Sequence, residues 1–151
     1  MDPMRPPAIG HRTAIKQLRS VIFVGIDGAA VVYPKGFIRK RLTPMVGGLG
    51  PLITAHTTDP LPDTPLYIAV TPDDFRIFGR PGLSSPFEIG RWKKGTYRAS
   101  IREGGLRLGL DLELEGLGRV RLNSRPRFLA GQTRAVFELV VQGASGPAIQ
   151  I

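Results

Sequence analysis

The stretch LRLGLDLELEGLGRVRL, residues 106–122, decides the fold. Leucine occupies every second position from Leu106 to Leu114, with arginine, glycine or an acidic residue between successive leucines. A period of two is typical of a β-strand that has one buried face and one solvent-facing face. The Gly-Leu-Gly sequence at 116–118 predicts a tight turn into a returning strand. We therefore expect an antiparallel hairpin whose leucine face lies on a hydrophobic core.

The composition limits the classes of function. The chain has 151 residues, about the length of one domain. It holds 21 Lys+Arg and 12 Asp+Glu residues, for a formal net charge of +9, and it has no cysteine. The missing cysteine excludes disulfides, thiol nucleophiles and thiolate metal sites. The positive charge favours nucleic acid, acidic lipid surfaces or acidic proteins as partners, although abundant arginine is also typical of proteins from GC-rich genomes.

Neither a membrane span nor a secretory signal is expected. No apolar run reaches the roughly 18 residues that a spanning helix requires. Prolines at positions 3, 6 and 7 interrupt the segment where a secretory signal needs continuous apolar residues. We therefore expect a cytoplasmic protein, with peripheral attachment to the inner membrane surface as a further option.

The N-terminal part predicts an arm, a helix and a strand. Prolines make residues 1–10 a flexible arm. Apolar residues then recur at steps of three and four, which predicts a helix over about 13–24. A strand over 21–26 remains an alternative, because that piece is short and β-branched. Residues 29–33 are nearly uncharged and predict the first strand of the sheet.

The central part predicts further antiparallel strands. Residues 66–71 and 75–78 flank an acidic turn and form a predicted hairpin, and residues 87–92 form the next strand. From residue 96 the alternation returns, with Arg98 and Arg102 on the outer face. Because adjacent strands share faces, we expect these arginines opposite the outer acids of the leucine strand, which are Asp111, Glu113 and Glu115.

The C-terminal part predicts one helix. Asn123 or Ser124 is suited to cap a helix with Pro126 in its first turn, where a missing N–H has no cost. Apolar residues at helical spacing extend this prediction over about 126–141. Residues 143–151 are expected to be a flexible tail, which leaves a single folded domain over 13–142.

The phrase LYIAVTPDDFRIFG, Leu66 to Gly79, resembles a hairpin of bacterial pleckstrin-homology-like (PH-like) domains. Gly90-Arg91-Trp92 and the helix after Asn123 fall where that resemblance places them, so it covers about Leu66 to Val141. It implies a mainly β, α+β fold, in which about seven antiparallel strands form a partly open barrel of two orthogonal sheets. The helix would plug one end. Eukaryotic members often bind phosphoinositides through a basic loop between their first two strands, whereas bacterial relatives look like protein-interaction modules.

The leading functional hypothesis is a non-enzymatic PH-like binding module in a bacterial cell. It would recognise a protein partner or an anionic membrane surface without a cofactor. Trp92 is interpreted either as a stacking platform or as an ordinary core aromatic. The candidate binding residues lie in two basic segments and are Lys35, Arg39, Lys40, Arg41, Arg91, Trp92, Lys93 and Lys94.

Two other classes of function remain as alternatives. A small basic barrel would bind nucleic acid along a phosphate track of Arg98, Arg102, Arg119 and Arg121. A small-ligand carrier or an enzyme would use the barrel interior, and His56 beside Asp59 or Asp63 would support it. No spacing of residues indicates a catalytic constellation or a metal site, so neither is expected.

Overall fold

The computed structural model describes residues 8–34, 65–79, 85–103, 105–126 and 131–148. These residues form a mostly antiparallel β-sheet with two helices, which confirms the predicted α+β class. In chain order the elements are β1 (Ile9–Gly10), α1 (Arg12–Leu18), β2 (Gly28–Pro34), β3 (Leu66–Val70), β4 (Asp74–Gly79), β5 (Phe87–Lys93), β6 (Arg98–Arg102), β7 (Arg107–Leu114), β8 (Gly118–Pro126) and α4 (Gly131–Gly143).

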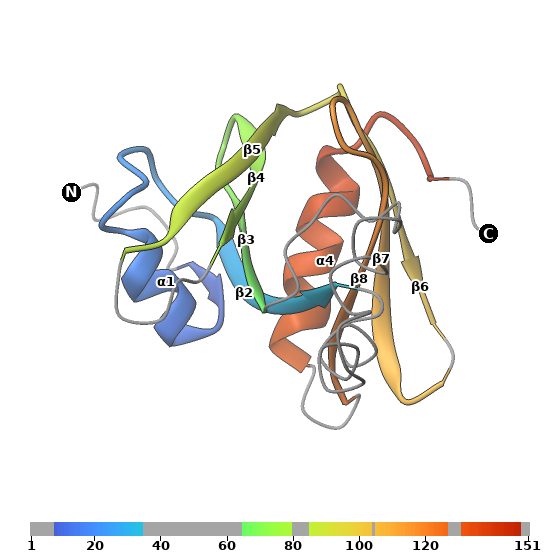
Figure 1. Cartoon of the computed structure of the whole chain (residues 1–151), viewed down its shortest axis with the longest axis horizontal. Coiled ribbons are helices and arrows are strands. Elements are labelled where there is room, and N and C mark those ends of the chain that lie inside the picture. The colour runs from blue at the N-terminus through green and yellow to red at the C-terminus, as the bar shows by residue number, and fades with distance from the viewer. Residues whose placement is uncertain (1–7, 35–64, 80–84, 104, 127–130, 149–151) are drawn as a thin grey trace, which may run out of the picture.

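Strand β2 joins two antiparallel meanders. The order across the sheet is β5-β4-β3-β2-β8-β7-β6, and β1 pairs in parallel with β2 outside this path. Residues 28–32 of β2 pair with β3, whereas Tyr33 and Pro34 pair with β8. Figure 1 shows the first meander, β2–β5, and the second meander, β6–β8, on either side of α4. Side chains from both meanders and from α4 therefore meet in one core, which includes Val136, Phe137 and Val140.

The leucines of β7 face the core as predicted with one exception, but the opposite face is less exposed than expected, since Asp111 is 5% exposed. Leu108, Leu110, Leu112 and Leu114 are all buried in the core between the meanders and α4. Leu106, which was expected to face the same way, is 67% exposed. It precedes β7 and follows Gly105, whose φ of 75° places this part of the chain in the β6–β7 turn. Because Leu106 lies beyond the end of the sheet, no core residues lie beneath its side chain, and the alternation no longer buries it.

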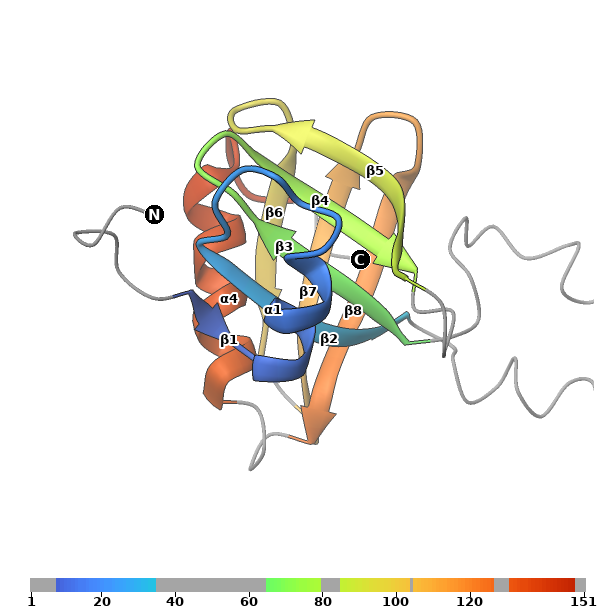
Figure 2. The same ribbon diagram turned by 90° about the vertical axis from the view of Figure 1, so that its left-hand side faces the viewer.

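A second apolar cluster lies on the outer face of the first meander, under α1. Ala14, Ile15 and Leu18 of α1 pack with outward-facing residues of β2, β3 and β4. The Tyr67 hydroxyl donates a hydrogen bond of 2.7 Å to Oε1 of Gln17, which fixes the helix to β3. Figure 2 shows α1 in front of this meander. Strand β3 is therefore buried on both faces, consistent with its continuous apolar sequence.

The first helix is shorter than predicted. It ends at Leu18 instead of near residue 24, and residues 21–26 form neither the predicted helix nor the alternative strand. The Ser20 hydroxyl donates to the carbonyl oxygen of Gln17, and the backbone N–H groups of Val21 and Ile22 both donate to Leu18. These bonds close a turn, after which Ile22 and Ile26 reach the outer cluster without a regular period.

The end of the predicted N-terminal arm pairs with the sheet. Gly10 has a φ of +123°, and a Cβ atom there would lie 1.8 Å from the carbonyl oxygen of Ala29.

Nδ1 of His11 accepts the Val31 N–H, so the ring proton resides on Nε2, which lies 3.0 Å from Oγ1 of Thr133. His11 thus bridges β2 and α4.

The C-terminal helix begins later than predicted. Asn123 and Ser124 do not cap it, because both belong to β8, which continues to Pro126, and the described part of α4 runs from Gly131. The buried Ser124 hydroxyl accepts the N–H of Leu108 on β7. The Ser124 hydroxyl therefore accepts a hydrogen bond from the neighbouring strand, although the sequence suggested that it would cap a helix. The predicted flexible tail is also packed in part, since residues 145–148 lie along β6.

Candidate functional site

Basic side chains from α1 and from β5 lie on the same side of the first meander. Arg76 pairs across the sheet with Ala69, which belongs to the outer cluster under α1. Arg91 and Lys93 pair with Arg76 and Asp74 of β4. Since paired residues of adjacent strands point the same way, Arg91 and Lys93 face outward on the side that carries α1.

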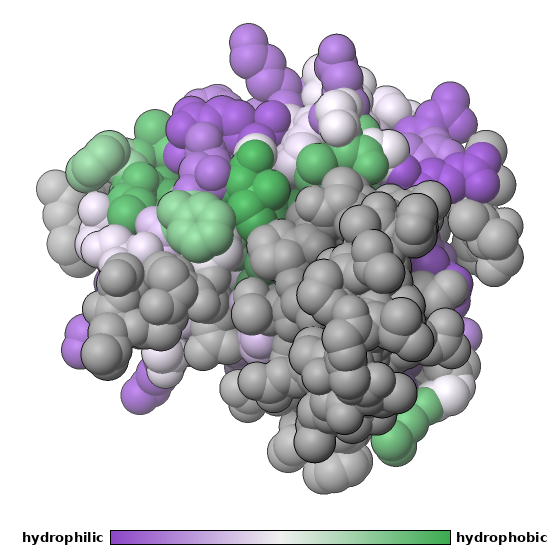
Figure 3. Space-filling view, in the orientation of Figure 1, coloured by the Kyte–Doolittle hydropathy of each residue, from purple (hydrophilic) through white to green (hydrophobic). Residues whose placement is uncertain are grey.

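This side combines positive charge with exposed apolar side chains. No aspartate or glutamate occurs between residues 8 and 26. Phe23 is 93% exposed and Val24 is 44% exposed, and we name these two residues the apolar tip. Figure 3 shows apolar side chains beside hydrophilic ones at the end of the molecule that holds α1 and β5. The exposed cations of this side, named the basic face, are Arg12, Lys16, Arg19, Arg91 and Lys93.

The apolar tip was missed from the sequence. The helical pattern over 13–24 accounted for Val21 and Ile22, but Phe23 and Val24 fall outside its apolar stripe. The signal available in the sequence was that these two apolar residues fit neither a helical nor a strand period. They lie in the irregular segment after α1.

A buried polar network lies beneath the basic face. Nε of Arg76 donates to Oδ1 of Asp74 at 2.8 Å, and the Thr71 hydroxyl donates to the same oxygen at 2.7 Å. Burial of the Asp74 carboxyl opposes ionisation, but the bonds from Arg76 and Thr71 and the charges of Arg76 and Arg91 outweigh it and lower its pKa. Glu88 lies 2.9 Å from Arg91 and 3.9 Å from Arg76. The network therefore holds Arg91 in place on β5, and the carboxylate of Glu88 reduces the positive charge at this end of the basic face.

We expect Asp74→Asn to destabilise the fold by about 3 kcal/mol at pH 7, because it leaves the buried Arg76 without its carboxylate. Asp74 has a lowered pKa in the folded chain, so its contribution is complete above the unfolded value of 3.8 and is lost as the pH falls through the folded value. Urea unfolding at several pH values measures this difference. The exposed neighbour Asp73→Asn is the control. An equal loss in both variants, or a difference that persists in strong acid, would contradict the prediction.

Trp92 is a core aromatic and offers no stacking platform. Its side chain points into the core, where the residue is 7% exposed and its ring centroid lies 5.9 Å from that of Phe75. The indole Nε1 donates a hydrogen bond of 2.9 Å to the carbonyl oxygen of Glu115 in the β7–β8 turn. Trp92 therefore links the two meanders and leaves the cations on either side of it to face solvent.

Of the other predicted binding residues, Lys94 alone lies in the part of the chain that the structure describes. Lys94 lies in the β5–β6 turn, with its stem against Gly143 at the end of α4. The basic segment Lys35, Arg39, Lys40 and Arg41 lies outside the described residues, as do His56, Asp59 and Asp63.

Acidic side chains interrupt the candidate nucleic-acid track. The expected cross-strand pairs are confirmed, with Arg98 3.9 Å from Glu113 and Arg102 3.7 Å from Asp111. Arg119 also lies 3.9 Å from Glu113, and Arg121 lies 3.3 Å from Asp111. Each carboxylate thus lies between two arginines, which reduces the positive charge available to a phosphate backbone.

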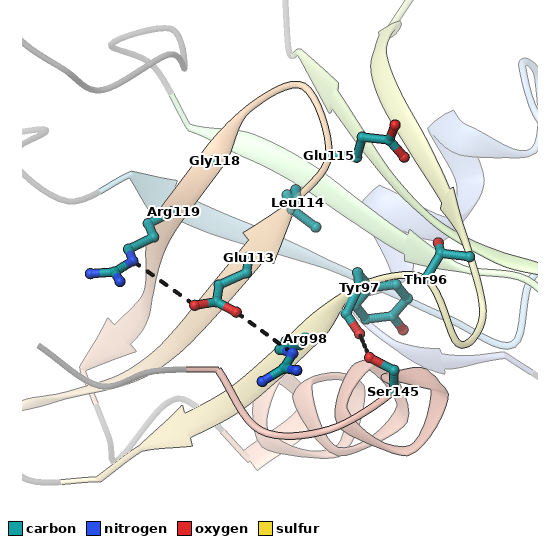
Figure 4. Close-up of a pocket in the computed structure, with 9 residues that line it drawn as sticks. All are labelled: Thr96, Tyr97, Arg98, Glu113, Leu114, Glu115, Gly118, Arg119 and Ser145. Carbon is teal, nitrogen blue, oxygen red and sulfur yellow. Dashed lines mark hydrogen bonds and ion pairs between the residues drawn. The ribbon is translucent and has the colours of Figure 1, made fainter.

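A hollow of about 410 Å³ opens at one end of this second meander. Figure 4 shows Glu113 between Arg98 and Arg119, with Ser145 of the C-terminal segment on the rim. Burial raises the pKa of Tyr97 to about 12, and its hydroxyl donates a hydrogen bond to the carbonyl oxygen of Val140. The lining residues are Thr96, Tyr97, Arg98, Glu113, Leu114, Glu115, Gly118, Arg119 and Ser145.

Among the described side chains, no group of three or more histidine, aspartate or glutamate residues could hold a metal ion. Neither described helix has the length and apolar character that crossing a membrane requires. The fold and the surface define an α+β protein with a basic face and an apolar tip. Comparison with protein-family models, curated proteins and solved structures finds no match.

Proposed function

We propose that the chain is a non-enzymatic PH-like binding module that recognises an anionic membrane surface, at the cytoplasmic side of a bacterial membrane. The observation that carries the proposal is the apolar tip, which follows a helix with exposed cations in a segment free of acidic residues. Lipid headgroups offer the matching chemistry, since they present negative charge above an apolar layer.

The arrangement of the strands supports the PH-like part of the proposal. Two antiparallel meanders share β2, and α4 follows the last strand and packs on the core between them. The resemblance, which covers residues 66–141 and leaves out β2, likewise implies antiparallel strands closed by a C-terminal helix. Helix α1 is an addition on the outer face of the first meander, and it places the basic face and the apolar tip on that side.

Stable attachment to a membrane requires both the basic face and the apolar tip. Burying a phenylalanine side chain contributes about 2 kcal/mol, and each cation near an anionic surface contributes about 1 kcal/mol. Either contribution alone gives weak, reversible attachment, whereas stable peripheral binding takes two signals. The basic face supplies long-range attraction that salt screens, and the apolar tip supplies a contact that salt leaves intact.

Co-sedimentation with vesicles tests this function. We expect binding to vesicles of phosphatidylcholine with phosphatidylglycerol and little binding to phosphatidylcholine alone. Reversal of charge in the double variant Lys16→Glu, Arg19→Glu should weaken binding more than about tenfold. The matched control is Arg98→Glu, Arg119→Glu, which changes the net charge equally on the other meander and should retain more binding. Equal, negligible binding to both vesicles would overturn the proposal and favour a protein partner.

A further inference from the structure

The edge of β6 that faces away from β7 is covered by the C-terminal segment of the same chain. Strand β6 ends the described sheet, and residues 144–148 follow α4 along its outer edge. Arg98 and Gly146 form a parallel β-bridge. The hydrogen bonds run from Ser145 N–H to the Tyr97 oxygen at 2.8 Å, from Ala99 N–H to the Gly146 oxygen at 3.1 Å and from Ala148 N–H to Ser100 Oγ at 2.8 Å.

Hydrogen bonds hold this segment in place more than packing does, and they include those from Ser145 Oγ to the Tyr97 oxygen at 3.1 Å and from Ser100 Oγ to the Ala148 oxygen at 3.3 Å. Its side chains are small, Ser145 and Pro147 are exposed, and Ala148 is its one buried residue. Pro147 lacks an N–H group and therefore interrupts the ladder. Gly143 and Gly146 lose much conformational entropy when they are ordered. A segment with so little buried apolar surface opens more readily than the strands of the core.

Cations flank the position of Ser145. The Lys94 stem lies against Gly143, before Ser145, and Arg98 is bridged to Gly146, after it. Ser145 also borders the hollow that Arg98 and Arg119 line (Figure 4). These arginines are 56% and 53% exposed and share Glu113, which lies 3.9 Å from each of them, so a further carboxylate would compete with Glu113 for their donors. A carboxylate at the position of Ser145 would lie among these cations.

We propose that the β6 edge is a strand-addition site for an extended acidic peptide of a partner protein, and that residues 144–148 occupy it until such a peptide displaces them. Backbone hydrogen bonds to Tyr97 and Ala99 would supply affinity for any extended chain. Lys94 and Arg98 would supply the preference for an acidic side chain. This proposal does not depend on membrane binding, because the basic face and the β6 edge belong to different meanders.

Fluorescence anisotropy with two labelled peptides tests the site on the full chain. One peptide is GASGPAIQI, residues 143–151, and the other carries glutamate at the position of Ser145. We expect the glutamate peptide to bind about fivefold more tightly, and Lys94→Ala or Arg98→Ala to remove that advantage. In Ala148→Asp, which weakens the chain's own segment, the glutamate peptide should bind more tightly than in the wild type. Where that variant lowers the melting temperature, Ser145→Ala, which removes the bond from the Ser145 hydroxyl to the Tyr97 oxygen in the chain's own segment alone, replaces it.

Hydrogen exchange on the wild-type chain gives a second readout. The Ala99 amide, bonded to the C-terminal segment, should exchange more than about tenfold faster than the Leu108 amide, which is bonded to Ser124. Equal exchange of the two amides would show that the segment does not open. Absence of peptide binding to a folded Ala148→Asp or Ser145→Ala chain, or equal binding of both peptides, would overturn the proposed site.

Discussion

Replacing Phe23 with serine is expected to lower binding to anionic vesicles about tenfold or more, without loss of stability. Tenfold corresponds to about 1.4 kcal/mol, less than the transfer of a phenylalanine side chain from water to an apolar medium. The phenylalanine is 93% exposed, so its removal takes no packing from the core. Vesicle co-sedimentation over a range of lipid concentrations measures the binding, and thermal melting checks the fold.

The matched control for this change is Leu106→Ser. Leu106 is also a large exposed apolar residue, but it precedes β7 in the second meander, away from α1. Its replacement should leave vesicle binding unchanged. At high salt the difference between wild type and Phe23→Ser should persist, because screening acts on the basic face and not on an apolar contact. Equal binding of Phe23→Ser and wild type would show that the apolar tip does not reach the lipid.

Patterns set by one buried face could be predicted from the sequence. The hairpin around residues 72–74 and the strands 87–92 and 96–102 agree with the structure to within a few residues. The inward leucines follow because a strand on a core must alternate. The outer ion pairs of Arg98 and Arg102 follow because neighbouring strands share faces.

Features set by tertiary contacts could not be predicted in this way. Ser124 has the chemistry of a helix cap, but β7 offers its hydroxyl the N–H of Leu108. Residues 145–148 look like a tail in sequence, yet the edge of β6 binds them through backbone groups that carry no sequence signal. Arg91 and Lys93 were candidate site residues. They lie on the same side as the cations of α1 because that helix packs on the outer face of the first meander, toward which both side chains point.

The largest effect on stability is expected from Leu110→Asp. Leu110 is fully buried and pairs with Leu122 on β8 and with Ile101 on β6. Truncation of a buried leucine costs about 2–5 kcal/mol, and an unpaired carboxylate at the same place adds its own desolvation cost. Because small proteins have only about 5–15 kcal/mol of stability, the variant should be largely unfolded at 25 °C. Circular dichroism and urea unfolding measure this loss.

Leu106→Asp makes the same chemical change at the exposed end of the leucine pattern. Its effect should stay within about 0.5 kcal/mol, because the side chain already meets solvent. The milder Leu110→Ala should fall between the two and keep a measurable unfolding transition. If Leu110→Asp were soluble and unfolded cooperatively at the wild-type urea concentration, the leucines of β7 would not face the core. In that case the position of β7 between β6 and β8, and the outward direction of Arg98 and Arg119 at the hollow, would also be wrong.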